Sequence, residues 1–233
     1  MHFLSNKTVL IMLVSVLLHQ QSASSEDNSS KPLNGTYLGR RIAPAMTHLA
    51  ADWLIRGDRE SEEDPARLLA RLDLKPGMLV CDMGCGNGFY SLKIAQAIGP
   101  DGRVLAVDIQ PEMLQLLSRR SVEAKIENID MILGTTTDPK LPDDKVDLVL
   151  MVDVYHEFSD PKAMLKKIRK SLKSTGRIAL VEFREEDASV PIRPEHKMSK
   201  KQILKEYEAN GFQLVSQYDG LPWQHLMFLG PKE

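Results

Sequence analysis

Three glycines at alternate positions, Gly84, Gly86 and Gly88, separate an apolar run from an amphipathic segment. The apolar run at 78–83 predicts a buried strand, and the segment at 89–98 predicts a helix. Glycine at such a junction permits a tight turn and lets a ligand approach the backbone closely. The junction therefore predicts a strand–turn–helix unit of an α/β sheet, with a ligand crevice at the carboxyl end of the strand.

The same alternation of strands and helices continues along the chain. Strands are expected at 78–83, 104–109, 129–133, 146–154, 177–183, 212–218 and 226–229. Helices are expected at 65–72, 89–98, 111–124, 161–172 and 199–211, and a further helix should begin at residue 42. Strands separated by helices of this length favour parallel pairing, with helices on both faces of the sheet. The last two strands have no helix between them and should form an antiparallel hairpin at one edge. The predicted class is α/β, with a doubly wound, seven-stranded and mostly parallel sheet.

Two acidic residues narrow the choice of ligand. A dinucleotide site carries a third glycine at the position that Phe89 occupies here. Asp82, at the end of the strand before the turn, would repel a pyrophosphate but suits a cation, which favours an amino acid–sulfonium ligand over a nicotinamide dinucleotide. Asp108, at the end of the next strand, could accept hydrogen bonds from both hydroxyls of a ribose. The alternative is that Asp108 is only a helix N-terminal acid before Pro111.

Four segments of the chain fit one pattern: Asp82-x-Gly84-x-Gly86-x-Gly88, Asp108, Asp147-Leu148-Val149-Leu150 and Gly176-Arg177-Ile178-Ala179-Leu180-Val181-Glu182. Together they resemble the class I S-adenosylmethionine-dependent methyltransferases of the small-molecule type, from about Ala66 to the C-terminus. The resemblance implies S-adenosyl-L-methionine as cofactor, the strand order 3-2-1-4-5-7-6 and an antiparallel last strand. The glycine turn would wrap the methionine end of that cofactor, and Asp82 would sit near its ammonium group.

The resemblance also implies how the rest of the cofactor is held. Asp108 would bind the ribose hydroxyls, and Ile109 would lie against the adenine. The adenine amino group would be bound by Asp138, which lies further along the chain than the family pattern places it, or by Thr135. Asp153 would lie at the sulfonium end.

The fourth strand leads into Tyr155, His156 and Glu157, which the resemblance places beside the reactive methyl group. We expect these three to be catalytic residues that bind or deprotonate the methyl acceptor. His156 is a plausible general base, because the pKa of histidine lies near neutrality. The alternative is that His156 and Glu157 only orient the loop. His156, His196 and His225 could converge with Glu157 on a metal ion, but scattered histidines are more often pocket or surface residues, and we assign no metal site.

The predicted function is methyl transfer from S-adenosyl-L-methionine to a small-molecule acceptor that the sequence does not identify. The alternatives are a non-catalytic exported protein that binds S-adenosylmethionine or a nucleoside, and a nicotinamide-dependent oxidoreductase. A net charge of −2, from 30 basic and 32 acidic residues, gives no indication of nucleic acid as a partner. Cys81 and Cys85 are expected to be free thiols, since a bond between them would distort the turn. The oligomeric state stays open.

The N-terminus has the three-part pattern of a secretory signal peptide. Lys7 precedes an apolar run at 9–18, which is followed by polar and small residues up to Ser25. We predict three parts: a signal peptide at 1–25, a flexible tether at 26–35, and a methyltransferase domain at 36–233 with a helical lead-in at 36–73. The protein would be exported, without a stable membrane span after cleavage. The alternative is a membrane tether formed by an uncleaved N-terminus.

Overall fold

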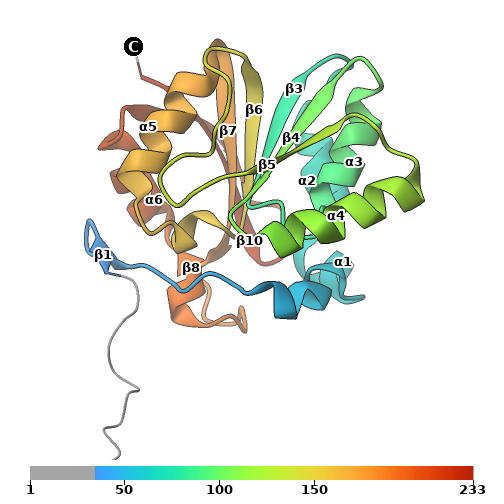
Figure 1. The fold of residues 1–233 in the computed structure, drawn as a ribbon. Helices are drawn as coiled ribbons and strands as arrows, with labels where there is room; N and C mark the ends of the chain where they lie inside the picture. The colour runs from blue at the N-terminus through green and yellow to red at the C-terminus, as the bar shows by residue number, and fades with distance from the viewer. Residues whose placement is uncertain (1–34, 233) are drawn as a thin grey trace, which may run out of the picture. The chain divides into compact units, whose positions relative to one another are not determined.

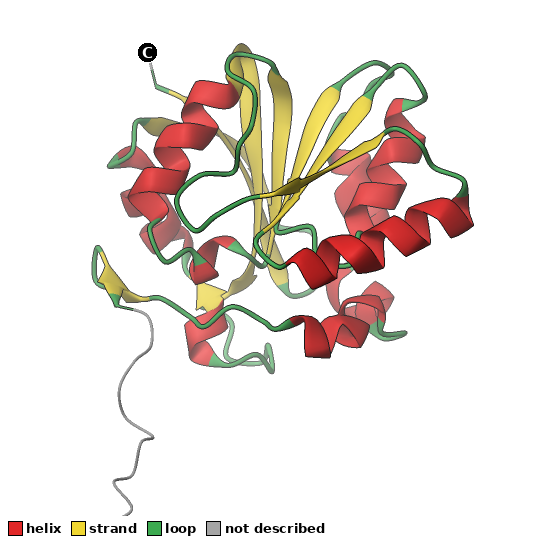
Figure 2. Cartoon of the chain, in the orientation of Figure 1, coloured by secondary structure: helices red, strands yellow, loops and turns green. Residues whose placement is uncertain are grey.

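The computed structural model describes residues 35–232. The predicted signal peptide at 1–25 and, apart from Gly35, the predicted tether at 26–35 lie outside the described residues. Within residues 35–232, no helix is both long and apolar enough to cross a membrane. The described chain has an α/β fold, in which one large sheet lies between two layers of helices (Figures 1 and 2).

Seven strands of the large sheet correspond to the seven that the sequence predicts. They are β3 (Leu79–Met83), β4 (Arg103–Asp108), β5 (Ile129–Leu133), β6 (Val146–Val152), β7 (Leu172–Arg184), β9 (Phe212–Tyr218) and β10 (Gln224–Pro231). Their order is β5-β4-β3-β6-β7-β10-β9, which confirms the predicted order 3-2-1-4-5-7-6. Only β10 runs antiparallel to its neighbours in this series, as expected for the last strand. A two-residue strand that was not predicted, β8 (Lys197–Met198), pairs in parallel with the end of β7.

Helices cover both faces of the sheet because neighbouring side chains of a strand point to opposite faces. Leu148 of β6 packs in a buried cluster with Ile94 and Leu117, whereas the next residue, Val149, packs in a second cluster with Met164. The first cluster joins the sheet to α2 (Pro65–Arg71), α3 (Phe89–Ile98) and α4 (Pro111–Ala124). The second joins it to α5 (Pro161–Ser171) and α6 (Lys200–Glu208), which lie on the opposite side in Figure 1. Cys81 and Cys85 are buried free thiols, as predicted.

The lead-in differs from its prediction. The helix expected to begin at Ile42 is absent, and residues 42–47 have no regular secondary structure. The elements found there are short: β1 (Thr36–Tyr37), β2 (Arg40–Arg41), the 3₁₀ helix η1 (His48–Ile55) and α1 (Arg59–Glu63). In Figure 1 this part of the chain crosses the end of the sheet instead of packing on one of its faces.

Hydrogen bonds to the rest of the fold explain the missing helix. The Met46 amide donates to Glu157 Oε1 at 3.2 Å, and the His48 amide donates to Gln110 Oε1 at 2.9 Å. A helix starting at residue 42 would need these amides for its own ladder. Pro44 also disfavours helical backbone at the residue before it. Contacts with the end of the sheet therefore override the helical spacing of the apolar residues.

Candidate active site

A cavity of about 630 Å³ lies at the carboxyl ends of β3, β4 and β6, and residues 44–54, here called the covering segment, supply part of its wall. Eight of the twelve residues predicted for the site line this cavity: Gly84, Gly86, Asp108, Ile109, Thr135, Asp153, His156 and Glu157. Four do not line it: Asp82, Gly88, Asp138 and Tyr155. These eight residues come from four separate segments of the chain, at 84–86, 108–109, 135 and 153–157, as expected at the carboxyl edge of a doubly wound sheet.

The glycine turn has a backbone that only glycine adopts without strain. Gly84 and Gly86 have φ angles of +67° and +53°. A Cβ atom at Gly84 would lie 2.3 Å from Val154 Cγ2, and one at Gly86 would lie 2.5 Å from Leu54 Cδ1. The amides of Gly84 and Cys85 both donate to the Val107 carbonyl, which fixes the turn against β4. Glycine is therefore required for the backbone conformation of the turn and for its packing against Val154 and Leu54, and both glycines line the cavity.

Gly88 lies close to α4. It precedes α3 with a φ angle of +81°, and a Cβ atom there would lie 2.1 Å from Leu117 Cδ1. Leu117 is fully buried, and Gly88 does not line the cavity. Gly88 thus leaves space for Leu117 of α4 and lies outside the cavity lining, and its role as a cofactor contact stays a prediction.

Asp108 is held in place on the cavity wall by backbone amides. Its Oδ2 accepts from the Gly86 amide and its Oδ1 from the Gln110 amide, both at 2.9 Å. Burial raises the pKa of Asp108, and these amide hydrogen bonds partly oppose the rise. Each carboxylate oxygen can accept a second hydrogen bond. Asp108 is therefore a fixed acceptor for ligand hydroxyl groups, and Ile109 lies beside it on the same wall, 44% exposed.

Asp82 lies behind the glycine turn. It lines a smaller void of about 30 Å³, together with Gly84 and Arg59, and its Oδ2 accepts from Ser91 Oγ at 2.5 Å. Burial raises the pKa of Asp82 to about 6, although the Ser91 hydroxyl lowers it. The carboxylate is adjacent to the main cavity but separated from it by the turn.

The raised pKa makes Asp82 a source of pH-dependent stability. Between the unperturbed pKa of 3.8 and the folded value of about 6, the folded state holds more protons than the unfolded state, so the free energy of unfolding falls as pH rises. The shift corresponds to about 3 kcal/mol. Asp82→Asn has no carboxyl group at this position, so its free energy of unfolding should not fall with pH for this reason. The free energy of unfolding of the variant minus that of the natural protein should therefore increase by up to about 3 kcal/mol between pH 4 and pH 7. Urea unfolding at several pH values measures this, and a difference that stays constant with pH would contradict it.

Asp153, at the end of β6, has an oxygen with no partner. Its Oδ2 accepts from Gln224 Nε2 at 2.6 Å, whereas Oδ1 is buried and has no hydrogen-bond partner within the described chain. Burial raises the pKa of Asp153 well above its usual range. Its φ angle of +51° is uncommon for a residue other than glycine and is typical of functional sites. A buried carboxylate oxygen without a hydrogen-bond partner is rare in folded proteins.

The three predicted catalytic residues form the short helix η2 (Tyr155–Glu157), and their side chains point in different directions. The Tyr155 hydroxyl donates to Glu206 Oε2 at 2.8 Å, and its ring packs against Tyr207 in the core. This side chain points away from the cavity towards α6, so the prediction of Tyr155 as a catalytic residue is not supported. His156 and Glu157 both line the cavity.

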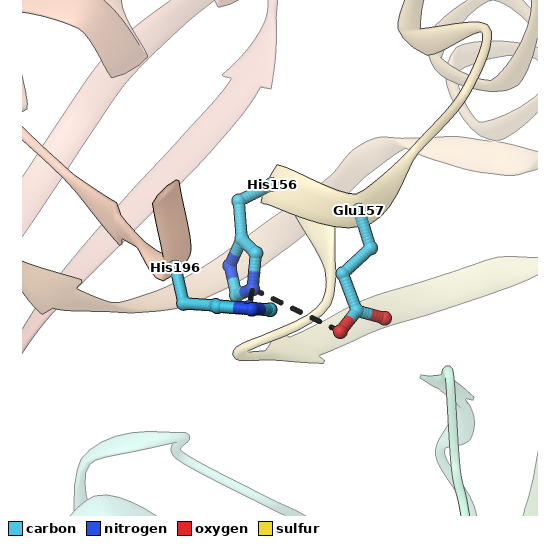
Figure 3. Close-up of side chains that lie close together, drawn as sticks. All are labelled: His156, Glu157 and His196. Carbon is cyan, nitrogen blue, oxygen red and sulfur yellow. Dashed lines mark hydrogen bonds and ion pairs between the residues drawn. The ribbon is translucent and has the colours of Figure 1, made fainter. Parts of the chain in front are cut away.

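His156 contacts the buried Glu182 carboxylate on one side and, on the other, lies beside Glu157 and His196 (Figure 3). Its Nδ1 lies 2.6 Å from Glu182 Oε2, and its Nε2 lies 3.0 Å from Nδ1 of His196, which ends η3 (Pro194–His196). Glu157 Oε1 is 3.9 Å from the same Nε2. Burial lowers the pKa of His156, but the charge and hydrogen bond of Glu182 outweigh it and the net change is upward. Burial raises the pKa of Glu157 to about 7.

The third histidine named from the sequence lies apart from this cluster. His225 Nε2 is 2.8 Å from Glu186 Oε2, and His225 does not line the cavity. Of the four residues that the sequence suggested for a metal cluster, only His156, Glu157 and His196 therefore lie together.

The two candidates for the adenine amino group are separated by the structure. Thr135 lines the cavity and its Oγ1 accepts from the Asp138 amide at 3.0 Å. The Asp138 carboxylate instead pairs with Lys167 at 2.8 Å on the surface. Thr135 therefore lies on the cavity wall and Asp138 does not, and the binding of the adenine amino group stays a prediction.

Sequence reasoning missed several residues of the site. Gln110 Nε2 donates to the Met46 carbonyl at 2.8 Å and so fastens the covering segment to β4. Trp53 and Leu54 of that segment line the cavity, and Gln224 supports Asp153 from β10. No motif connects these residues, because they meet only when distant parts of the chain fold together.

Comparison with known proteins gives one consistent family. A family model described as a methyltransferase domain matches residues 74–224, more than half of the chain. The chain is 31% identical over 114 residues to a nocamycin O-methyltransferase from Saccharothrix syringae, covering 49% of this chain and 41% of that protein. It is 25% identical over 114 residues to a demethylmenaquinone methyltransferase from a Geobacillus strain, covering 49% of each. The chain thus spans less than half the length of these curated relatives.

Solved structures give the same fold. The crystal structure of a SAM-dependent methyltransferase from Aquifex aeolicus superposes with a TM-score of 0.74 at 24% identity, covering 79% of this chain and 98% of that one. A structure of a type 11 methyltransferase from Sulfolobus solfataricus has a TM-score of 0.58 at 21% identity, covering 74% and 94%. The fold, the cavity at the carboxyl edge of the sheet and the family match agree, and this chain belongs to the methyltransferase domain family.

Proposed function

We propose that this protein transfers a methyl group from S-adenosyl-L-methionine to a small-molecule acceptor. The observation that carries the proposal is the Asp108 carboxylate, held by two backbone amides on the wall of a cavity of about 630 Å³. It lies beside two glycines, Gly84 and Gly86, that line the same cavity.

The residues of the cavity fit that cofactor. Asp108 offers acceptors for ribose hydroxyls, and the half-exposed Ile109 offers an apolar surface for adenine. Gly84, Gly86 and Asp153 line the part of the cavity where the methionine end of the cofactor would lie. When bound, S-adenosylmethionine would supply a methyl group on a sulfonium: the acceptor attacks the methyl carbon in line, the carbon–sulfur bond breaks, and the thioether S-adenosylhomocysteine leaves.

The other end of the cavity suits an acceptor with an apolar body and a polar group. Phe158, Met164 and Phe183 provide apolar surface, and His156 and Glu157 provide polar groups close to it. The covering segment, fastened by hydrogen bonds from Met46 to Glu157 and from His48 to Gln110, excludes water from donor and acceptor. The relatives' names, a nocamycin O-methyltransferase and a demethylmenaquinone methyltransferase, support a small-molecule acceptor.

Calorimetric titration of the purified full chain with S-adenosylmethionine and, separately, with NADH tests the proposal. We expect one molecule of S-adenosylmethionine bound per chain and no heat of binding with NADH, because Phe89 replaces the third glycine of a dinucleotide turn. Absence of S-adenosylmethionine binding would overturn the proposal. Binding without methyl transfer to any acceptor in broad pools would favour the alternative of a non-catalytic binding protein.

A further inference from the structure

Three potential metal ligands meet on the wall of the cavity. They are Nε2 of His156, Nδ1 of His196 and Oε1 of Glu157, and these atoms all lie within 4.8 Å of one another (Figure 3). We propose that His156, Glu157 and His196 form a binding site for a divalent transition-metal ion of the Zn²⁺ type. Two imidazoles and one carboxylate are a ligand set typical of catalytic sites that keep a coordination position open.

The spacing of the ligand atoms is close to what a bound ion needs. Bonds of about 2.0–2.2 Å to nitrogen and oxygen hold neighbouring ligand atoms roughly 3.0–3.5 Å apart. The two histidine nitrogens are already 3.0 Å apart, and Glu157 Oε1 is 3.9 Å from His156 Nε2. A small rotation of the Glu157 side chain would complete the set. This side chain is 15% exposed, and the hydrogen bond that fixes it comes from the Met46 amide at 3.2 Å.

A second carboxylate prepares His156 for coordination. Glu182 is fully buried and its Oε2 lies 2.6 Å from His156 Nδ1. A carboxylate at that distance requires the proton on Nδ1, so the lone pair of Nε2 points into the cluster. A buried carboxylate behind a coordinating histidine is the usual outer contact of protein metal sites, where it fixes the tautomer and raises the basicity of the ligand.

The position of the cluster indicates what the metal would do. All three ligands line the cavity, so open coordination positions would face its interior. An ion there would bind an oxygen of a molecule in the cavity, and that molecule would carry a hydroxyl or carboxylate group. The metal site does not depend on the proposed methyl transfer, because metal binding can be measured on a protein that binds no S-adenosylmethionine.

Zinc titration of the untagged full chain, stripped with a chelator and then dialysed, tests the site. We expect one equivalent of zinc per chain by elemental analysis. Glu157→Gln and His196→Ala should each weaken Zn²⁺ binding by at least about tenfold. His48→Ala is the matched control, because the half-buried His48 side chain lies near the same cavity but belongs neither to the cluster nor to the cavity lining, and its hydrogen bond to Gln110 is made by the backbone amide. It should bind zinc as the natural protein does.

Cobalt(II) gives a second readout that does not depend on affinity alone. Co²⁺ added to the stripped protein should produce visible d–d absorption that Glu157→Gln and His196→Ala lose and His48→Ala retains. Thermal melts check that each variant is folded, and Glu157→Gln, which preserves the shape of the side chain, decides the result if His196→Ala is unstable. Less than stoichiometric zinc in the natural protein, or equal zinc binding by Glu157→Gln and the natural protein, would overturn the proposal.

Discussion

Asp108→Asn is expected to weaken S-adenosylmethionine binding by at least about a hundredfold. Hydrogen bonds to a charged group contribute roughly 1.5–3 kcal/mol each, and a carboxylate that binds both ribose hydroxyls makes two of them. A loss of about 3 kcal/mol in total corresponds to about two powers of ten in affinity. In the variant, one oxygen becomes an amide group that donates hydrogen bonds. Because each Asp108 oxygen accepts from a backbone amide, the new donor group would face either the Gly86 amide or the Gln110 amide, and that amide would lose its acceptor.

Asp138→Asn is the matched control for this experiment. The same chemical change is made at the other carboxylate suggested for this end of the cofactor, but the Asp138 carboxylate pairs with Lys167 outside the cavity. We expect its affinity for S-adenosylmethionine to equal that of the natural protein. Calorimetry on both variants and the natural protein, with melting curves as a check on folding, gives the comparison. Equal affinities for Asp108→Asn and Asp138→Asn would refute the ribose role of Asp108.

The fold could be predicted because its signals are local and repeat along the chain. The strand of Leu148 and Val149 is apolar on both faces, which is what a central parallel strand with helices on both sides requires. The glycine turn and Asp108 could be predicted for the same reason, since a strand end and the turn after it are contiguous in sequence. Such features depend on neighbours a few residues away, and tertiary contacts only reinforce them.

The parts that could not be predicted depend on contacts between distant segments. Tyr155 and His156 are adjacent in the sequence, yet Tyr155 turns towards Glu206 in the core and His156 turns towards Glu182 and the cavity. Both residue types suit catalysis, and nothing in the local pattern separates them. The covering segment could not be predicted for the same reason. Its apolar residues are spaced as in a helix, but hydrogen bonds from the Met46 and His48 amides to residues at the end of the sheet hold it in another conformation.

Gly88→Ala is expected to lower the free energy of unfolding by about 2–5 kcal/mol, of which the backbone and the packing each contribute a part. A left-handed backbone costs a residue with a Cβ atom roughly 1–2 kcal/mol, and the φ angle here is +81°. An extra methyl group in a filled core adds roughly 1–3 kcal/mol. The new Cβ would meet Leu117 Cδ1 at 2.1 Å and Cγ at 3.1 Å, and Leu117 is fully buried, so its side chain cannot move into solvent.

Gly77→Ala separates the two contributions, because the two glycines have nearly the same positive φ angle and differ in their surroundings. Gly77 has a φ angle of +82°, and a Cβ atom there would meet nothing within 4 Å. It should therefore show only the backbone cost of roughly 1–2 kcal/mol. Urea unfolding of both variants gives the packing cost at Gly88 as their difference, about 1–3 kcal/mol. Equal destabilisation would show that Leu117 adjusts freely, and the contact between α3 and α4 would then not explain why glycine occupies position 88.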